Sequence, residues 1–128
     1  MELTFYKCNR CGNLLIPLID SGVNPVCCGE LMEKLEACSS DAAVEKHVPV
    51  IERDSDERHI NISIGSVDHP MTEEHLIQFV VLLYGERIYT FKLEPGDEPK
   101  ARCTIKDTTV PLTVYAYCNL HGLWKAEA

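Results

Sequence analysis

Four cysteines near the start of the chain constrain its fold more than any other feature of the sequence. Cys8 and Cys11 are separated by two residues, and Cys27 and Cys28 follow side by side. Four thiolates at this spacing can enclose one metal ion in a tetrahedral site, and soft sulfur ligands suit either zinc or a single iron. Because two adjacent residues cannot both point at one ion without opening the ligand angles, we expect a distorted tetrahedron. The spacing leaves open the choice of metal, as well as a vicinal disulfide or uncommitted thiols.

The segment that carries these cysteines has little apolar sequence of its own. Its strand candidates are residues 3–6 and 14–19, which together would bury too little surface to fold unaided. A bound metal would supply the missing stability. Residues 37–44 are small and mostly polar, which is typical of a connector. We therefore predict a metal-binding module over residues 1–36 and a second domain over residues 37–128.

The rest of the chain has the pattern of a succession of β-strands. Ile60, Ile62 and Ile64 alternate with polar residues, and a continuous apolar run follows at residues 76–84. Turn-forming residues separate the later runs. The predicted strands cover residues 47–52, 60–64, 76–84, 87–93, 102–107 and 110–118. This pattern, with no long helix, predicts an all-β chain in which the metal-binding module precedes a seven-stranded, immunoglobulin-like antiparallel sandwich.

The charge and hydropathy of the chain narrow the classes of partner. A net charge of −8 argues against nucleic acid, because phosphate binding requires clustered Lys and Arg. No run approaches the roughly 18 apolar residues that a membrane span needs. The same negative charge would repel an anionic substrate, so such a substrate would require local positive charge beside its site.

The N-terminal sequence and the cysteine count lead us to expect a cytoplasmic protein. Residues 1–6 place an acid where a secretory signal carries basic residues, and no apolar stretch of about 7–15 residues follows. Seven cysteines are an odd number, which fits a reducing compartment better than a disulfide framework. In a reducing compartment, grouped cysteines more often bind metal.

Histidine and cysteine residues in the second domain are candidates for another metal site. Cys118 and His121 lie three positions apart and are followed by Gly122, which permits a tight turn, so one loop could deliver two ligands. His69 precedes a proline, which favours an extended backbone, and His75 stands just before the long apolar run. These segments are too scattered for spacing alone to join them into one site.

Five segments of the chain carry a resemblance to a known family. EKHVPVIE (45–52), HPMTEEHLIQFV (69–80) and VYAYCNLHGLWK (114–125) resemble the signature segments of superoxide reductases, in the same order and at about the same separations. YKCNRCGN (6–13) and VCCGELM (26–32) are similar to the desulforedoxin-like module of the two-iron class, the desulfoferrodoxin family. Together these segments span nearly the whole chain.

The resemblance implies two non-haem iron ions per chain. One centre would have an axial thiolate, four equatorial imidazoles and an open sixth position, with the ligands Cys118, His47, His69, His75 and His121. The other would be an electron-transfer centre in a rubredoxin- or desulforedoxin-like knuckle, with the ligands Cys8, Cys11, Cys27 and Cys28. Three residues match no ligand position. We expect His59 to be a solvated strand residue, and Cys38 and Cys103 to pack as small hydrophobes.

The implied reaction is the one-electron reduction of superoxide to hydrogen peroxide, without release of dioxygen. Lys46 would be the local positive charge that steers the anion and delivers a proton. Glu45 resembles a glutamate that occupies the sixth position of the oxidised iron. For both residues an ordinary solvated charge is the competing interpretation. The resemblance also implies rubredoxin or a similar small electron donor, and a homodimer.

Other classes of function remain open at this point. A zinc-stabilised binding module on an immunoglobulin-like sandwich would be colourless and would have no chemistry. A pure electron carrier would use the cysteine site and leave the histidines idle. A dismutase would also oxidise superoxide and release dioxygen. A ferrous oxygenase fits poorly, because its usual ligands are two histidines and a carboxylate.

Overall fold

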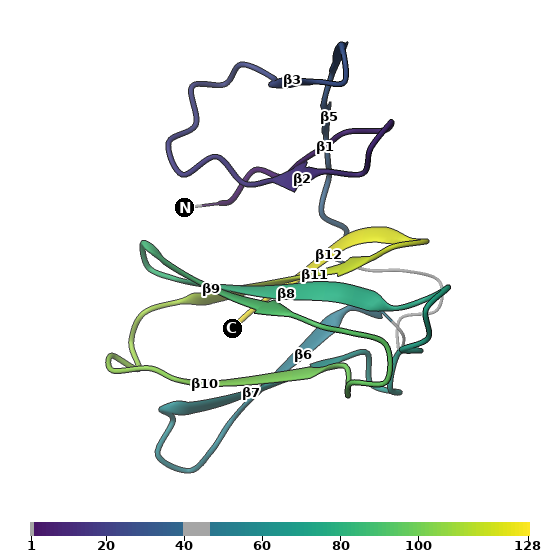
Figure 1. Cartoon of the computed structure of the whole chain (residues 1–128). Helices are drawn as coiled ribbons and strands as arrows, with labels where there is room; N and C mark the ends of the chain where they lie inside the picture. The colour runs from purple at the N-terminus through teal and green to yellow at the C-terminus, as the bar shows by residue number, and fades with distance from the viewer. Residues whose placement is uncertain (1, 40–46) are drawn as a thin grey trace. The chain divides into compact units, whose positions relative to one another are not determined.

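The computed structural model describes residues 2–39 and 47–128, and the chain divides into two compact units, Met1–Glu36 and Ala37–Ala128 (Figure 1). Both units are built from short antiparallel strands joined by turns, so the predicted all-β fold is confirmed. In the described residues, no helix is long and apolar enough to cross a membrane.

The first unit contains two small sheets and a minimal core. Its strands are β1 (Tyr6–Lys7), β2 (Leu14–Leu15), β3 (Val26–Cys27), β4 (Glu30–Leu31) and β5 (Glu33–Lys34). A three-stranded sheet has the order β2-β1-β5, and β3 pairs with β4 in a separate hairpin. The buried cluster consists of Tyr6, Cys8 and Met32, with Cys27 packed against it. So small a core leaves this unit dependent on another source of stability.

Strand length explains where the prediction for this unit differs from the structure. The strand expected at residues 14–19 ends after Leu15, two residues before Pro17, which has no backbone N–H to donate to a sheet. Leu18 and Ile19 lie beyond it and are exposed. Strands of two residues, such as β3, β4 and β5, are too short to show any apolar period in the sequence.

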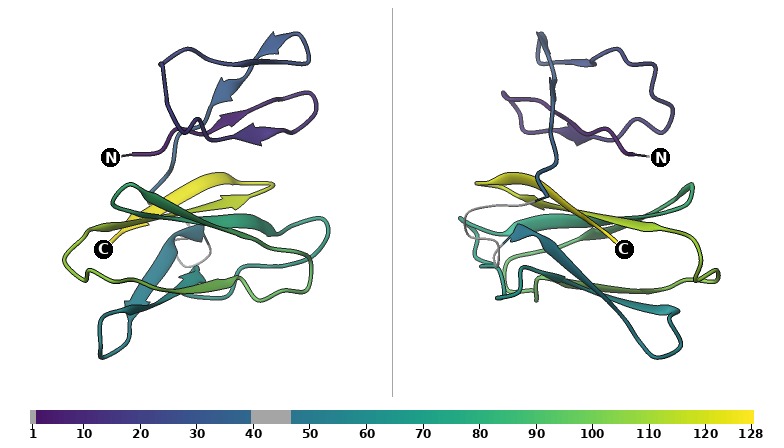
Figure 2. Two further views of the ribbon diagram at one scale, coloured as in Figure 1. Left: turned by 60° about the vertical axis from the view of Figure 1, so that its left-hand side comes forward. Right: turned by 180° about the vertical axis from the view of Figure 1, so that it is seen from behind.

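The second unit is a sandwich of two antiparallel sheets. Its strands are β6 (Pro49–Arg53), β7 (His59–Ile64), β8 (Ile77–Tyr84), β9 (Arg87–Lys92), β10 (Lys100–Thr104), β11 (Leu112–Cys118) and β12 (Gly122–Glu127). One sheet has the order β10-β7-β6 and the other the order β12-β11-β8-β9. The two sheets form facing layers (Figure 2). The described part of this unit therefore has the seven strands that the sequence predicts for an immunoglobulin-like sandwich.

The polarity of the strands explains how the two layers pack. In β7, Ile60, Ile62 and Ile64 are buried while the residues between them are less so, as expected for a strand with one face turned inward. β8 lies between β11 and β9, and its residues 80–84 are all buried. The isoleucines of β7 pack in one cluster with buried residues of β8, β10 and β11. The continuous apolar run in the sequence is therefore the central strand of its sheet.

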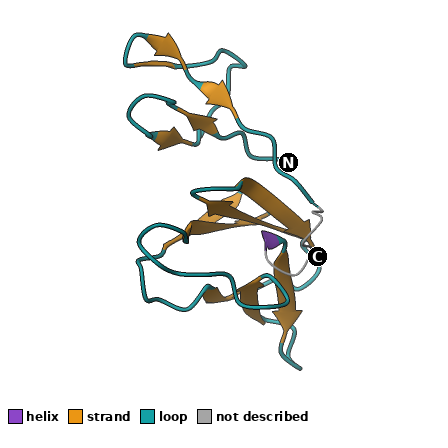
Figure 3. Ribbon diagram, turned by 90° about the vertical axis from the view of Figure 1, so that its right-hand side faces the viewer, coloured by secondary structure: helices purple, strands orange, loops and turns teal. Residues whose placement is uncertain are grey.

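The last strand was not assigned from the sequence. Gly122 has a φ of 85°, a left-handed conformation that glycine adopts without steric cost, and it reverses the chain after Cys118. β12 then returns along β11, with Cys118 paired to Gly122. Figure 3 shows this alternation of strands and tight connections in the second unit. The turn is important for the site because it lies between two candidate ligands.

Candidate metal centres

One end of the sandwich gathers three connections that carry histidine or cysteine. β7 ends where β6 begins, because Ile64 pairs with Pro49. β11 ends where β8 and β12 begin, because Cys118 pairs with both Ile77 and Gly122. The segment before β6, the β7–β8 loop and the β11–β12 turn bring together five candidate ligands, His47, His69, His75, Cys118 and His121.

Four imidazoles from these connections form a closed ring. The centroid separations around the ring are 5.1, 4.6, 5.1 and 4.8 Å, for the pairs His47–His69, His69–His75, His75–His121 and His121–His47. Neighbouring rings are inclined by between 62° and 82°. One ligand atom from each histidine and the sulfur of Cys118 all lie within 4.8 Å of one another. Four nitrogens and one sulfur therefore surround a common point.

The thiol of Cys118 is positioned by an irregularity in its strand. The register of β11 against β8 shifts between Tyr117, which pairs with Phe79, and Cys118, which pairs with Ile77. A bulge of this kind re-aims the side chains next to it. Cys118 is completely buried, and its Sγ lies 3.7 Å from Nδ1 of His121. The sulfur is therefore held on the protein side of the histidine ring.

The donor atoms of this cluster fit one metal ion. Nε2 of His47 and Nδ1 of His121 are 3.0 Å apart, about the separation of two nitrogens that each lie about 2.1 Å from one ion at a right angle. His69 donates from Nδ1 to the carbonyl oxygen of Pro70 at 2.7 Å, which leaves Nε2 with its lone pair. That Nε2 is buried and has no hydrogen-bond partner among the described residues. A bound metal would satisfy it.

Burial keeps His69 in the form that can bind metal. Its side chain is 3% exposed, and burial lowers its pKa to about 4, more than the hydrogen bond to Pro70 raises it. The nearby imidazoles of His75, His47 and His121 lower the pKa further, because a second positive charge is disfavoured there. At neutral pH the imidazole is therefore neutral, as a metal ligand must be.

The histidine ring is buried on one side and open on another. His47 is buried, His75 is half-buried and His121 is exposed. Trp124, a buried residue of β12, stacks on His47 with ring centroids 4.7 Å apart and planes inclined by 16°. The indole therefore sets the plane of this imidazole. Trp124 lies within the segment HGLWK (121–125), but residue type and spacing alone assign it no role.

The second cluster consists of the four cysteines of the first unit. The sulfur atoms of Cys8, Cys11, Cys27 and Cys28 all lie within 4.8 Å of one another. Cys11 and Cys27 are 3.6 Å apart at sulfur, and Cys27 and Cys28 are 4.0 Å apart. The edge of a tetrahedron with metal–sulfur bonds of about 2.3 Å is about 3.8 Å. All seven cysteines are free, so the adjacent pair is not joined in a disulfide.

A tight hairpin turn brings the adjacent cysteines to one site. Cys28 and Gly29 form the two-residue loop between β3 and β4, and both have positive φ, 53° and 76°. A type I′ turn requires this conformation, which is unfavourable for any residue other than glycine. The strained backbone of Cys28 turns its sulfur toward that of Cys27. Neither residue type nor spacing in the sequence indicates this turn for a Cys-Gly pair.

Backbone N–H groups and neighbouring sulfurs give the four thiols unequal acidities. The amides of Cys11 and Arg10 lower the pKa of Cys8 to about 6, and the Cys11 amide lies 3.4 Å from the Cys8 sulfur. Hydrogen bonds from the Cys27 thiol to the sulfurs of Cys11 and Cys8 raise the pKa of Cys27 to about 12, because they stabilise its protonated form. A cation at the centre would allow all four to ionise.

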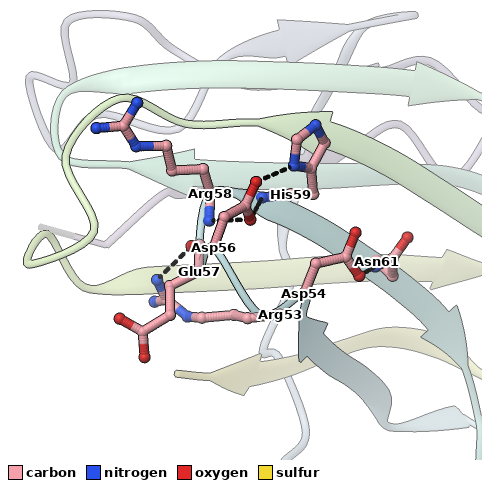
Figure 4. Close-up of polar contacts among 7 residues, drawn as sticks. All are labelled: Arg53, Asp54, Asp56, Glu57, Arg58, His59 and Asn61. Atoms are coloured by element: carbon pink, nitrogen blue, oxygen red, sulfur yellow. Dashed lines mark hydrogen bonds and ion pairs between the residues drawn. The ribbon is translucent and has the colours of Figure 1, made fainter.

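Three other residues lie apart from both clusters. His59 is exposed at the start of β7, and its Nδ1 lies 2.6 Å from a carboxylate oxygen of Asp56 (Figure 4). Cys103 is half-buried and packs against the sandwich core. Cys38 is exposed, so the expectation that it packs as a hydrophobe is wrong. Its backbone instead bridges to that of Trp124.

The two charged residues predicted to act beside the histidine ring, Glu45 and Lys46, lie outside the described residues. They immediately precede His47 in the sequence. Their roles remain predictions.

Comparison with known proteins relates both units to one family. A family model described as Desulfoferrodoxin matches residues 39–127. The desulfoferrodoxins of Syntrophotalea carbinolica and Nitratidesulfovibrio vulgaris are each 46% identical to this chain, over 126 and 127 residues. These alignments cover 98% and 99% of this chain, and 97% and 98% of the relatives. The crystal structure of the superoxide reductase from Treponema pallidum matches with a TM-score of 0.79 and 29% identity, over 98% of this chain and 97% of that one.

Proposed function

The chain belongs to the desulfoferrodoxin family, and on that premise we propose that it is a superoxide reductase whose iron is held by the cluster at the end of the sandwich. The ligands would be Cys118, His47, His69, His75 and His121. The closed ring of four imidazoles beside a buried thiol is the observation that carries this proposal. Iron bound there would supply one electron to superoxide, which with two protons becomes hydrogen peroxide.

The charges of the ligands suit an anionic substrate. Four neutral imidazoles and one thiolate contribute −1, so the +2 charge of a ferrous ion is reduced to +1. The low pKa of His69 supports the neutral form of at least one of these imidazoles. The thiolate of Cys118 would donate electron density toward the metal, in the way that axial thiolates do in haem enzymes.

The exposed side of the ring would admit superoxide and water. His121 is exposed and His75 is half-buried, whereas Cys118 is fully buried. Solvent can therefore deliver protons on the side away from the thiolate. A site closed to water would lack this proton supply, and hydrogen peroxide would then form and leave more slowly.

We propose that Lys46 attracts superoxide and supplies a proton, and that Glu45 takes the open ligand position when no substrate is present. The net charge of −8 supports a need for local positive charge, because the overall field repels an anion. Glu45 and Lys46 immediately precede the candidate ligand His47 in the sequence, which supports a role for both residues close to the metal.

We propose that Cys8, Cys11, Cys27 and Cys28 hold an iron that accepts electrons from rubredoxin or a similar small protein. Sulfur separations of 3.6 and 4.0 Å support a tetrahedral ion, and the soft donors suit iron as well as zinc. In this proposal residues 1–36 are an accessory module and residues 37–128 carry the catalytic centre. Reaction with superoxide would therefore persist after loss of the cysteine site.

We propose a homodimer, located in the cytoplasm. Six apolar side chains are exposed on the first unit, Leu15, Leu18, Ile19, Val23, Val26 and Leu31. This many exposed apolar side chains on so small a unit is costly in water, and a second copy could cover some of them. Free thiols at both clusters support a reducing compartment. Sedimentation of the purified protein as a monomer would contradict the dimer.

Metal content and superoxide kinetics test the central proposal. Protein purified without added metal should contain two irons per chain, and pulse radiolysis of the reduced protein should show rapid loss of superoxide with formation of peroxide. Release of dioxygen would indicate a dismutase. Failure of the reduced, iron-loaded protein to react would indicate an electron carrier. Colourless protein that holds zinc alone would favour the binding module.

A further inference from the structure

His75 lies in the β7–β8 loop, which connects the two sheets, in the turn Thr72 to His75 just ahead of β8. Two side chains make hydrogen bonds to the backbone groups around His75. Asn119 bonds the residues on either side of His75, and Thr72 bonds His75 itself. Neither side chain belongs to the ring of candidate ligands.

Asn119 connects the loop of His75 to the turn that carries Cys118 and His121. Its Oδ1 accepts a hydrogen bond from the Leu76 amide at 3.0 Å, and its Nδ2 donates to the Glu74 carbonyl at 2.9 Å. The Asn119 amide also donates to the carbonyl oxygen of Leu76 at 3.2 Å. Three hydrogen bonds therefore join two ligand-bearing connections that are more than forty residues apart in the sequence.

Thr72 holds the backbone of His75 from the other side. The His75 amide donates to Oγ1 of Thr72 at 3.1 Å, and Oγ1 lies 3.2 Å from the His75 carbonyl oxygen. The Thr72 amide donates to the same carbonyl at 3.0 Å. Such a turn, closed by a threonine hydroxyl, restricts the backbone of the residue that it encloses.

Rigid placement of His75 has a chemical consequence at the metal. The imidazole of His75 has ring neighbours on both sides, His69 at 4.6 Å and His121 at 5.1 Å, so a shift of its backbone would open the ring on two edges. Asn119 also follows Cys118 directly in the sequence. Its side chain therefore fixes the backbone around His75 relative to the turn that carries the Cys118 thiol. Residues that orient metal ligands in this way affect metal affinity and the properties of the bound ion.

We infer that Asn119 and Thr72 are positioning residues for His75 at the iron site, with Asn119 setting the place of His75 relative to the Cys118 thiolate. This inference rests on the proposed iron site but adds to it two residues that do not touch the metal. Asn119 holds the carbonyl oxygen of Glu74 and the amide of Leu76, and Thr72 holds the amide and the carbonyl oxygen of His75.

Removal of the Asn119 side chain tests the inference in the full-length, iron-loaded protein. The measurement is the rate at which a chelator removes iron, followed separately at each centre by its visible absorption. Asn119→Ala should release the iron of the histidine site roughly 10–100-fold faster than the wild type, the usual effect of losing an outer partner of a metal ligand. The four-cysteine centre of the same chain is the internal reference and should release its iron at the wild-type rate.

Asn61→Ala is the matched control. Asn61 belongs to the same unit and also makes two side-chain hydrogen bonds of 2.8 Å. It donates one to Asp54 (Figure 4) and accepts the other from Arg102. Its loss should leave iron release unchanged at both centres. If Asn61→Ala and Asn119→Ala accelerate release equally, the effect is one of general stability and the inference is overturned. Wild-type release from Asn119→Ala would overturn it as well.

Thr72→Val provides a second variant in case Asn119→Ala folds poorly. Thr72 is exposed, and valine preserves its shape while removing the hydroxyl that bonds His75. Faster iron release from the histidine site, together with a shifted thiolate-to-iron absorption band, is expected from a correctly folded variant. Release and absorption identical to the wild type would defeat the inference.

The same experiment separates this inference from the proposed activity. Iron release and absorption are measured without superoxide, so a wild-type protein that binds iron at the histidine site but does not react with superoxide would contradict the activity alone. A wild-type protein that binds no metal at the histidine site would overturn both.

Discussion

The residues of the histidine site differ in exposure according to the part that each would play. Cys118 is completely buried at the end of a central strand, whereas His121, three residues later, is exposed. One short turn thus supplies a candidate ligand from the protein interior and a candidate ligand at the surface. The sulfur of Cys118 is kept from solvent, while the imidazole of His121 is accessible to it.

Cys118→Ser should separate the role of the thiolate from that of the imidazoles. Serine is nearly isosteric but is a hard, poorly ionised donor that does not replace a soft thiolate. We expect weakened iron binding at the histidine site and loss of its thiolate-to-iron absorption, with the four-cysteine centre unchanged. Iron analysis and visible spectra of the purified variant measure this. An unaltered spectrum would show that Cys118 is not a ligand.

Lys46→Ile tests electrostatic attraction of the substrate. A cation near a site raises the association rate of an anion, and salt screens the effect over a Debye length of about 10 Å at 0.1 M. We expect a lower second-order rate with superoxide at low ionic strength, and a difference that narrows as salt is added. Pulse radiolysis over a salt series measures it. Equal rates at low ionic strength would contradict a steering role.

At the scale of structural elements, two left-handed turns position the ligands. Gly29 lies in the β3–β4 turn beside Cys28, and Gly122 lies in the β11–β12 turn beside His121. A Cβ added at either glycine would have no heavy atom within 4 Å, so space does not limit substitution there. Backbone conformation alone makes glycine necessary at these two positions.

Gly29→Ala and Gly122→Ala serve as controls for each other. Each should cost about 1 kcal/mol of local stability, because a side chain disfavours positive φ. Gly29→Ala should accelerate iron loss from the four-cysteine centre only, and Gly122→Ala from the histidine centre only. Chelator competition followed at the two absorption bands measures this. Equal effects of either variant on both centres would show that the turns do not act locally.

The β6–β7 hairpin is organised by Asp56, away from either metal centre. Its carboxylate accepts hydrogen bonds from the amides of Arg58 and His59, at 2.9 and 3.2 Å. These amides, and then the His59 side chain, lower the pKa of Asp56. A carboxyl with a lowered pKa stabilises the folded state above its unfolded pKa of about 3.9, and the contribution disappears as the pH falls through the folded value.

Asp56→Asn should therefore reduce stability in a pH-dependent way. The amide retains the acceptor oxygen but loses the charge beside His59. We expect the difference in melting temperature between wild type and variant to be constant near pH 7 and to shrink below about pH 4. Thermal unfolding across this range measures it. A difference that grows as the pH falls would contradict the assigned role of the carboxylate.

At the scale of the whole chain, the two units differ in how they are stabilised. The second unit buries a large cluster between its sheets, while the first has a small buried cluster of Tyr6, Cys8 and Met32 and a group of four cysteines that could hold a metal. Burial of apolar surface can maintain the sandwich without metal. We expect the first unit instead to depend on bonds to an ion, as small metal-binding domains generally do.

Removal of both metals from the full-length protein should therefore affect the units unequally. We expect residues 2–36 to become susceptible to proteolysis, while the sandwich persists. Trp124 is the single tryptophan of the chain and lies in the second unit, so its fluorescence reports the sandwich alone. Protection of residues 2–36 in the metal-free, reduced protein would contradict this prediction.

Much of the fold could be anticipated because its signals are local. The alternation of Ile60, Ile62 and Ile64 and the unbroken run of β8 directly report which faces are buried. β12 and the strands β3, β4 and β5 of the first unit were missed, because two-residue strands and a strand set by a single glycine turn leave no period in the sequence. Trp124 and Asn119 were likewise assigned no role, because their contacts join segments distant along the chain.

The amino-acid sequence was sufficient to predict the class of fold and the four-cysteine group and, by resemblance, the family and the ligands of the histidine site. These depend on residue type, on short-range periodicity and on motif order. The tertiary structure decided that His47, His69, His75 and His121 close into one ring beside Cys118, and that Asn119 ties two of the contributing loops together. Sheet register decides which loop ends meet, and the register between strands distant in the sequence, such as β8 and β11, cannot be read from either strand alone.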